Sequence, residues 1–274
     1  MSGRSVLVTG ASSGIGLGVA LRLRERGWRV LAAVREPSRA PRELEDVEVV
    51  ALDLAQPAQI QSAVARIEAL DCLVNNAGYA LTGPFASYAP EQMERQVRVN
   101  LLGPALLTQR LIPALRRAHG RIINVSSLSG ETGLPMNAMY CAAKHALEGW
   151  SEALHHELKS QGIQVALVAP GGFRTRFANN MEWGALPVAA QSIEARQLDG
   201  YRAMQAKLLA RPGREPGPVI EAIVRLAEKD IMPLRTRVGF DAHLLHALKR
   251  WLPEGIALGV LGSAFRRRLA DGKR

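Results

Sequence analysis

The sequence predicts an α/β fold of the doubly wound type, in which helices cover both faces of a parallel sheet of about seven strands. First, short apolar runs alternate with longer segments of helical periodicity as far as Thr175. Second, these strands are separated by segments long enough for crossovers, so neighbouring strands should pair in parallel, and right-handed crossovers place helices on both faces. Third, 274 residues with 47 % hydrophobic content can bury the core of one large domain, residues 1–274.

The strands are predicted from apolar, β-branched runs that stop at glycine, proline or polar residues. Residues 5–9 (SVLVT) show this pattern clearly, because they stop at Gly10. The helices are predicted where apolar residues recur every three or four positions, as Ile15, Val19 and Leu23 do. The predicted strands are residues 5–9, 29–34, 47–52, 71–74, 121–125, 163–169 and 236–239. The predicted helices are residues 14–26, 56–69, 90–117, 138–160, 193–210 and 219–229, with two short helices divided by Pro253 in a tail over 241–268.

Cysteine content and hydropathy narrow the class of protein. Cys72 and Cys141 are too few for a disulfide framework and lack a metal-binding spacing, so a reducing compartment and no metal site are expected. The N-terminus shows no apolar signal-peptide core. No apolar run reaches the about 18 residues that a membrane span needs. These observations favour a cytoplasmic protein.

The charge is strongly basic, with a formal net charge of +10. From Arg211 onward the chain has 13 lysines and arginines against 7 acidic residues, so residues 241–274 are expected to form a basic helical tail. Such a tail could bind nucleic acid, an anionic membrane surface or an acidic ligand. Because no nucleic-acid motif accompanies the charge, a solvated surface is favoured and no nucleic-acid partner is expected.

A glycine-rich segment between the first predicted strand and the first predicted helix has the features of a phosphate cradle. It reads Thr9-Gly10-Ala11-Ser12-Ser13-Gly14-Ile15-Gly16. Glycines allow a tight turn and a close approach of the backbone to a pyrophosphate, while the helix N-terminus offers free amides and a positive dipole end. The residues expected to contact a dinucleotide here are Gly10, Ser12, Ser13, Gly14, Ile15 and Gly16.

Further motifs stand at the ends of the predicted strands and on the predicted helices. In chain order they are Asn75-Asn76-Ala77-Gly78, Asn100, Ser127, Tyr140 with Lys144, and Pro170-Gly171 with Thr175. Together with the T-G-x-x-x-G-x-G spacing, they resemble the classical short-chain dehydrogenase/reductase family over about residues 4–240. The segment around the tyrosine resembles the 17β-hydroxysteroid and retinol dehydrogenase branch of that family.

The resemblance implies a Rossmann-type fold and a nicotinamide cofactor. Asp53 resembles the aspartate that contacts adenine in the family, although a helix cap or a turn would also explain an aspartate at this position. Lys144 is expected to hold the nicotinamide ribose, and Thr175 the carboxamide or a phosphate. The cofactor contacts implied beyond the glycine segment are Asp53, Leu54, Asn76, Ala77, Gly78, Tyr140, Lys144, Pro170, Gly171, Phe173 and Thr175.

The end of the second predicted strand indicates NADP(H) rather than NAD. A carboxylate there would accept a hydrogen bond from the ribose 2′-hydroxyl of NAD, whereas an arginine would bind the 2′-phosphate of NADP. Val34 stands where an NAD-preferring relative would carry aspartate, and Arg35 where NADP-preferring relatives carry arginine. A solvated surface arginine is the alternative for Arg35.

The spacing of Tyr140 and Lys144 has a chemical reason. Residues four apart on a helix share a face. A tyrosine has an ordinary pKa of about 10, and a nearby ammonium stabilises its phenolate, which makes it a better proton-transfer group near neutral pH. Ser127, at the carboxyl end of a strand, can hydrogen-bond the substrate oxygen. Asn100 resembles the family residue that orients a water behind the lysine, although an asparagine can also satisfy a helix break.

These residues predict hydride transfer between NADP(H) and an alcohol/carbonyl pair, with Tyr140 as the general acid/base. The alternative is a regulatory protein that senses NADP(H) without turnover. Relatives of that kind usually lack the tyrosine or the lysine, and both are present in this chain.

The family likeness also implies a substrate lid and an oligomer. The lid is expected over residues 176–215, where apolar side chains such as Phe177, Trp183 and Tyr201 suit a steroid-, retinoid- or lipid-like substrate. A homodimer or homotetramer is expected through the helices at 90–117 and 138–160, whose outward faces should carry Leu101, Leu106, Leu147 and Trp150. Arg266-Arg267-Arg268 after an apolar stretch leaves open contact of the tail with a membrane surface.

Overall fold

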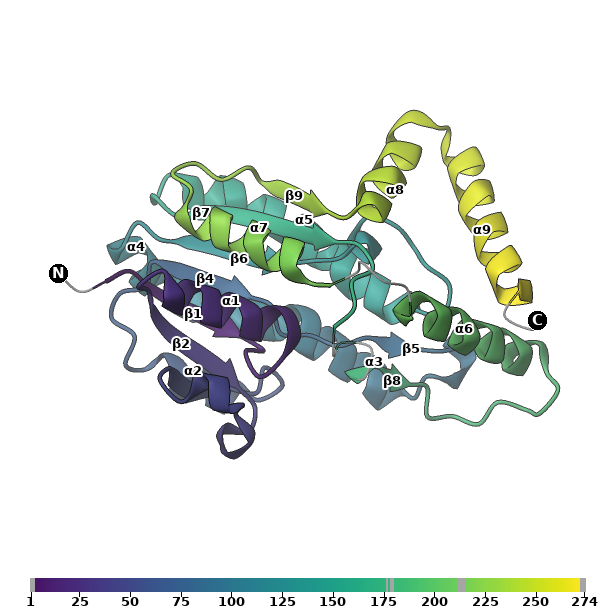
Figure 1. Ribbon diagram of the computed structural model, residues 1–274, viewed down its shortest axis with the longest axis horizontal. Helices are drawn as coiled ribbons and strands as arrows, with labels where there is room; N and C mark the ends of the chain where they lie inside the picture. Colours follow the sequence, from purple (N-terminus) through teal and green to yellow (C-terminus); the bar gives the residue numbers. More distant parts are fainter. Residues whose placement is uncertain (1–2, 176, 178–179, 211–214, 272–274) are drawn as a thin grey trace.

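The computed structural model describes residues 3–175, 177, 180–210 and 215–271, and side chains except those of 208–209 and 264–271. Seven parallel strands form one sheet, as the sequence predicted, and their order is β3-β2-β1-β4-β6-β7-β9 (Figure 1). These strands are β1 (Ser5–Thr9), β2 (Arg29–Val34), β3 (Glu48–Ala51), β4 (Cys72–Asn75), β6 (Arg121–Val125), β7 (Gln164–Pro170) and β9 (Arg235–Val238).

The order of the strands reverses direction beside β1. The chain moves outward through β2 and β3 and then returns to place β4 on the other side of β1, where Val6 pairs with Cys72. All five residues of β1 are buried, which explains its unbroken apolar and β-branched sequence. In sheets of this kind ligands bind outside the carboxyl ends of the strands at the reversal point.

Helices cover both faces of the sheet (Figure 1). On one face α1 and α7 bury Val19, Leu23 and Ile223 against the strands, and on the other α2, α4 and α5 bury side chains such as Leu107 and Leu158. Burial of each such leucine or isoleucine contributes about 1.5–3 kcal/mol. The helices are α1 (Gly14–Glu25), α2 (Pro57–Val64), α3 (Pro90–Val97), α4 (Gly103–Arg117), α5 (Ala138–Lys159), α6 (Ile193–Leu209), α7 (Gly217–Glu228), α8 (Phe240–Trp251) and α9 (Glu254–Asp271). The short helical turns are η1 (Pro37–Arg39), η2 (Arg42–Leu44), η3 (Phe85–Ser87), η4 (Arg98–Leu102) and η5 (Leu128–Gly130).

The predicted helix over 90–117 is helical throughout, but its α-helical hydrogen bonding is interrupted. A π-helical turn, η4, separates α3 from α4, and the side chain of Asn100 within it bonds the backbone of Tyr79. At Gly103, where α4 begins, a Cβ would lie 2.5 Å from the carbonyl oxygen of Leu54. The wider turn and the missing side chain let the helix approach the neighbouring loop closely.

The predicted helix over 56–69 is also too long, since α2 ends at Val64. Leu70 is fully buried, and its amide donates to the carbonyl of Ala114 at 3.2 Å. The chain therefore leaves the helix early in order to bring Leu70 into the core before β4.

A second, two-stranded sheet was not predicted. It pairs β5 (Leu81–Thr82) with β8 (Glu182–Trp183). Gln92 on α3 fastens this sheet, because its amide nitrogen donates to Glu182 Oε1 at 2.7 Å and to the Trp183 carbonyl at 2.9 Å. Strands of two residues are too short to show an alternating pattern.

The segments expected to form a lid and a tail contain the helices α6, α8 and α9, and the lid segment also contains strand β8. Within 176–215, α6 packs against α9, and α9 belongs to the tail together with α8 (Figure 1). Residues 176, 178–179, 211–214 and 272–274 lie outside the described residues, and so do the side chains of Arg266-Arg267-Arg268. Within the described ranges, no helix combines the length and the apolar character that crossing a membrane would require.

Candidate functional site

The predicted site residues gather at the carboxyl ends of the central strands. The glycine segment follows β1, Asn76-Ala77-Gly78 follows β4, Ser127 follows β6, and Gly171 to Thr175 follow β7. Because all these strands are parallel, their carboxyl ends meet at one edge of the sheet. The fold thus brings into one region motifs that the sequence spreads over more than half of the chain.

The glycine turn has the backbone that a phosphate cradle requires. Gly10 and Gly14 have positive φ angles of 69° and 58°. A Cβ on Gly16 would overlap the carbonyl oxygen of Gly10, so no side chain fits at that position. Ser13, the residue before α1, makes no side-chain capping hydrogen bond. The amides at the start of α1 therefore keep the capacity to bind an anion.

Thr9 joins the glycine turn to the segment after β4. Its Oγ1 accepts from the amides of Asn76 at 2.9 Å and Ala77 at 3.0 Å, and donates to the Val74 carbonyl at 3.3 Å. The amide group of Asn76 donates back to the Thr9 carbonyl at 2.9 Å. These bonds fix the distance between two of the predicted cofactor-binding segments.

Sequence reasoning missed Asp241, which shapes the loop after β7. Its Oδ2 accepts from the amide of Gly172 at 2.8 Å, and a Cβ on Gly171 would overlap its carboxylate. Farther along the same loop, Thr175 faces the glycine turn, since a Cβ on Gly14 would lie 3.5 Å from Thr175 Cβ. Asp241 lies 69 residues from Gly172 in the chain, so no local pattern marks this contact.

The residues expected beside the adenosine end are less enclosed. Arg35 directly follows β2 and is exposed, and no ion pair joins it to another described residue. Asp53 Oδ1 accepts from the amide of Ala55 at 2.8 Å, which is a turn-forming hydrogen bond. Asp53 therefore has a local structural role, and a contact with adenine stays a prediction. Leu54 is buried, and its carbonyl oxygen lies beside Gly103.

Tyr140 and Ser127 are brought together, although they come from different elements. Tyr140 lies in the first turn of α5, is 8 % exposed, and has the Ser127 side chain near enough to act on its pKa. Burial raises the pKa of Tyr140 well above its ordinary value, and Ser127 acts in the opposite direction. The Oγ of Ser127 also accepts from the amide of Ser129 at 3.1 Å, which orients the serine.

Lys144 is buried one helical turn after Tyr140. Its Nζ lies 5.9 Å from the centre of the Tyr140 ring and donates to the Val125 carbonyl at 2.8 Å. Burial lowers the pKa of Lys144 to about 8, while the charge of Glu148 acts to raise it. An ammonium that is short of water and close to a phenol can stabilise the phenolate strongly.

Asn100 is buried, but its side chain is engaged elsewhere. Its Nδ2 donates to the Tyr79 carbonyl at 2.8 Å, and its Oδ1 accepts from the Tyr79 amide at 3.2 Å. Among the described residues no hydrogen bond joins Asn100 to Lys144. The side chain of Asn100 thus supports the helix break and the segment after Gly78, and a role in a proton relay stays a prediction.

A hydrogen-bonded asparagine shortly before Tyr140 was not predicted. Asn137 Nδ2 donates to the Pro135 carbonyl at 3.1 Å and to the hydroxyl oxygen of Tyr201 at 2.8 Å. The Tyr201 ring also meets the Trp183 ring edge-on, with centroids 6.3 Å apart, and Phe177 lies 5.7 Å from the Tyr140 ring. Tyr201, Trp183 and Phe177 were expected in the lid, but Asn137 had no signal beyond its place three residues before Tyr140.

A metal site would need several histidine, cysteine or acidic side chains close together. Among the residues that the structure describes, no three such side chains are grouped so that they could hold a metal ion.

Comparison with known proteins identifies the family. The sequence profile described as short chain dehydrogenase matches residues 4–184. An uncharacterized oxidoreductase of Escherichia coli K12, YbbO, is 41 % identical over 75 % of this chain and 80 % of its own length. The 3-ketodihydrosphingosine reductase of Bacteroides thetaiotaomicron is 32 % identical over 93 % and 96 % of the two chains. Human retinol dehydrogenase 5 is 33 % identical over 93 % and 87 %.

Solved structures of similar proteins support the same family. A short-chain dehydrogenase from Streptomyces avermitilis has a TM-score of 0.73 at 30 % identity and covers 94 % of this chain and 98 % of its own. One from Burkholderia cenocepacia, in complex with NADP, has a TM-score of 0.74 at 25 % identity over 95 % and 98 %. One from Burkholderia phymatum, in complex with NAD, has a TM-score of 0.74 but 22 % identity over 91 % and 95 %, and supports the fold alone. The chain is therefore an oxidoreductase of the classical short-chain dehydrogenase/reductase family.

Proposed function

We propose that this protein interconverts an alcohol and a ketone or aldehyde with NADP(H), using Tyr140 as the general acid/base. The observation that carries the proposal is the buried Tyr140, with Ser127 beside it and Lys144 Nζ 5.9 Å from its ring. Tyrosine, serine and ammonium groups together can transfer a proton to a carbonyl oxygen and stabilise the charge that develops there.

The residues present fit a nicotinamide dinucleotide. The turn has positive φ angles at Gly10 and Gly14 and no room for a Cβ at Gly16, and Ser13 leaves the α1 N-terminus without a side-chain cap. The diphosphate would lie there, with Asn76-Ala77-Gly78 and Thr175 beside it. When bound, the cofactor supplies or accepts the hydride at the substrate carbon.

The chain's own residues would handle the proton. In the direction of reduction, Tyr140 Oη gives its proton to the substrate oxygen, and Ser127 Oγ holds that oxygen by a hydrogen bond. The high pKa of buried Tyr140 keeps it protonated before the reaction. The Lys144 ammonium then stabilises the phenolate, which lowers the cost of giving up the proton. In oxidation the same groups act in reverse.

NADP(H) rather than NAD(H) is proposed on the charge of Arg35. Arg35 stands exposed at the end of β2 without a carboxylate partner among the described residues, so it is available to a 2′-phosphate. The NADP complex of the Burkholderia cenocepacia relative supports the same choice.

The substrate is proposed to be apolar and lipid-like. Phe177 lies 5.7 Å from the Tyr140 ring, and Trp183 packs against Tyr201 within the segment expected to form the lid. These aromatic rings suit a steroid, retinoid or long-chain carbonyl. Two of the similar proteins are named as a retinol dehydrogenase and a ketodihydrosphingosine reductase, which supports this class. An NADP(H) sensor without turnover is not favoured, because the serine, tyrosine and lysine are all present.

The homo-oligomer is proposed to form through α4 and α5. A groove of about 410 Å³ between them is lined by side chains that include Leu106, Ile112, Trp150 and Leu154. Leu147, expected on this outward face, is instead 2 % exposed within the single chain, because it points toward the interior of the fold. Leu101 and Leu106 are half-buried, as a face open to a partner allows. Contact of the tail with a membrane surface is not needed for this proposal.

The test is oxidation of NADPH and NADH against ketones, aldehydes, steroids and retinoids. Tyr140→Phe should lower turnover by about 10²–10⁴-fold, since it removes the acid/base group. NADPH binding, followed by fluorescence, should be retained. Tyr88→Phe is the matched control, because Tyr88 is buried too but bonds the Leu81 and Met136 carbonyls. Equal turnover of wild type and Tyr140→Phe would reject the mechanism.

A further inference from the structure

An ion-pair network lies behind the proposed catalytic helix. Arg235 and Arg237 on β9 face Glu131, which follows η5, and Glu148 on α5. Arg237 Nε lies 2.9 Å from Glu131 Oε1, and Arg235 Nε lies 2.7 Å from Glu148 Oε2. Arg235 also reaches Glu152, farther along α5, at 2.6 Å. The network therefore connects β9 both to the loop that carries Ser127 and to the helix that carries Tyr140 and Lys144.

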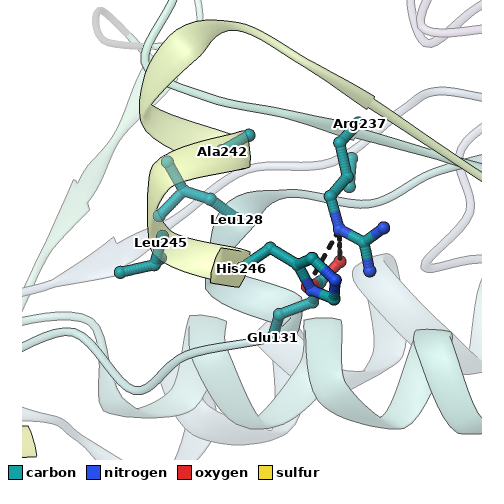
Figure 2. A pocket seen from close by; sticks show the side chains of 7 residues that line it. Leu128, Glu131, Arg237, Ala242, Leu245 and His246 are labelled. Atoms are coloured by element: carbon teal, nitrogen blue, oxygen red, sulfur yellow. Dashed lines mark hydrogen bonds and ion pairs between the residues drawn. The ribbon is translucent and has the colours of Figure 1, made fainter. Parts of the chain in front are cut away.

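The contacts of Glu131 in this network have a structural role. Figure 2 shows the Glu131 carboxylate between Arg237 and His246, and His246 Nδ1 lies 3.0 Å from Glu131 Oε2. The ammonium of Lys249 on α8 donates to the backbone carbonyl of Glu131. Each oxygen of the Glu131 carboxylate has a partner, so these contacts fasten α8 and β9 to the loop after η5.

The Glu148 half is not explained in the same way. Glu148 is 6 % exposed, and its Oε2 is bound by Arg235. Its Oε1 is buried and has no hydrogen-bond partner among the described residues. A buried carboxylate with an unpaired oxygen is costly, so the fold gains little stability from a charge at this position.

Glu148 lies one helical turn after Lys144 on the same face of α5. Gly130 packs against both, since a Cβ there would lie 3.0 Å from Glu148 Cγ and 3.1 Å from the Lys144 carbonyl oxygen. Packed protein therefore surrounds the two charges, and their attraction is screened less than it would be in water.

The ammonium of Lys144 needs such a charge. Lys144 is 5 % exposed, and the described residues give its Nζ one hydrogen bond, to the Val125 carbonyl. Burial lowers the pKa of Lys144 to about 8, and Glu148 is the charge that opposes this fall. Without Glu148 a larger share of Lys144 would be neutral in the range where Tyr140 works.

We propose that Glu148 is a positioning residue that keeps Lys144 charged during the reaction. The inference rests on the proposed function, because it gives Lys144 the task of stabilising the Tyr140 phenolate. Glu148 touches neither substrate nor cofactor in this scheme. The charged and titratable groups around the pair are Tyr140, Cys141 and Glu152 on α5, Arg235 on β9, and Glu131 after η5.

The test compares the pH dependence of kcat in Glu148→Gln and Glu152→Gln. Glutamine keeps the shape of Glu148 and can still accept from Arg235, but it removes the charge. The high-pH limb of the profile is the pH range in which kcat falls. In Glu148→Gln this limb should move down by about half to one pH unit, because a nearby opposite charge is lost. Glu152 contacts the same arginine but is farther from Lys144 and 49 % exposed, so Glu152→Gln should keep the wild-type limb. Glu148→Asp, which retains the charge, should restore it.

The inference would be overturned if kcat fell at the same high pH in wild type and Glu148→Gln. It would also be overturned if Glu148→Gln and Glu152→Gln shifted that pH equally. If Glu148→Gln does not fold, Arg235→Gln decides. It keeps the carboxylate and removes the positive charge that offsets it, so its limb should move above that of wild type, and an unchanged or lower limb would overturn the inference. Two other results would reject the proposed function itself: no turnover by the wild-type protein, or full activity of Tyr140→Phe.

Discussion

Replacing Lys144 with methionine should stabilise the cofactor-free protein at pH 7 while it removes turnover. Lys144 is buried, and its pKa falls from 10.5 to about 8. The difference of 2.5 corresponds to about 3 kcal/mol by which folding is opposed at pH 7. Methionine removes this cost but loses the hydrogen bond to the Val125 carbonyl, worth about 1 kcal/mol. The net gain at pH 7 should be about 2 kcal/mol.

The stability of the wild-type protein depends on pH because folded and unfolded chains bind a proton at Lys144 with different pKa values. Below pH 8 Lys144 is protonated in both the folded and the unfolded chain, so the cost is fully present. Between pH 8 and 10.5 the unfolded chain binds more protons, so the stability of wild type rises with pH. Methionine does not titrate. The advantage of Lys144→Met should therefore shrink above pH 8 and disappear near pH 10.

The assay is urea unfolding of both proteins at several pH values from 7 to 10, because the difference between them cancels groups that titrate in both. Lys159→Met is the control, since Lys159 lies on the same helix but is exposed. Its difference from wild type should not depend on pH in the way that Lys144→Met does. A pH-independent difference for Lys144→Met would refute burial as the cause of the shifted pKa.

Two further predictions concern the cofactor. Arg35→Ala should lower kcat/KM for NADPH by about 10–100-fold, because it removes one charged hydrogen bond, and should leave kcat/KM for NADH unchanged. Arg39→Ala is the control, since Arg39 is exposed, and it should change kcat/KM for neither cofactor. Equal losses with both cofactors would remove Arg35 from the 2′-phosphate. Gly16→Ala should abolish tight NADPH binding in a titration, because its Cβ would overlap the Gly10 backbone. Gly18→Ala on the same helix would press on the Ile220 side chain, away from the Gly10 backbone, and should bind NADPH normally. Normal binding by Gly16→Ala would contradict the cradle.

The strands were predictable because burial on both faces leaves a direct mark on the sequence. The bounds of β1 and β2 agree with the predicted residues 5–9 and 29–34, since each is a run of apolar residues with a clear stop. Helix ends were less predictable. The π-helical turn at Asn100 bonds the backbone of Tyr79, a contact that periodicity within the helix does not reveal.

The candidate site was predictable where residue type and local spacing carry the chemistry. The four-residue step from Tyr140 to Lys144 and the glycines from Gly10 to Gly16 are of this kind. Asp241 and Asn137 were missed because their roles come from contacts with Gly172 and Tyr201, which lie 69 and 64 residues away.

The sequence by itself determined the alternation of strands and helices, the phosphate cradle and the spacing of the proton-transfer pair, because each depends on neighbours in the chain. Only the tertiary structure decided that Ser127 meets Tyr140 and that Arg235 holds Glu148 across 87 residues. Burial also set the pKa of Lys144, since the loss of water around a side chain is a property of the packed fold.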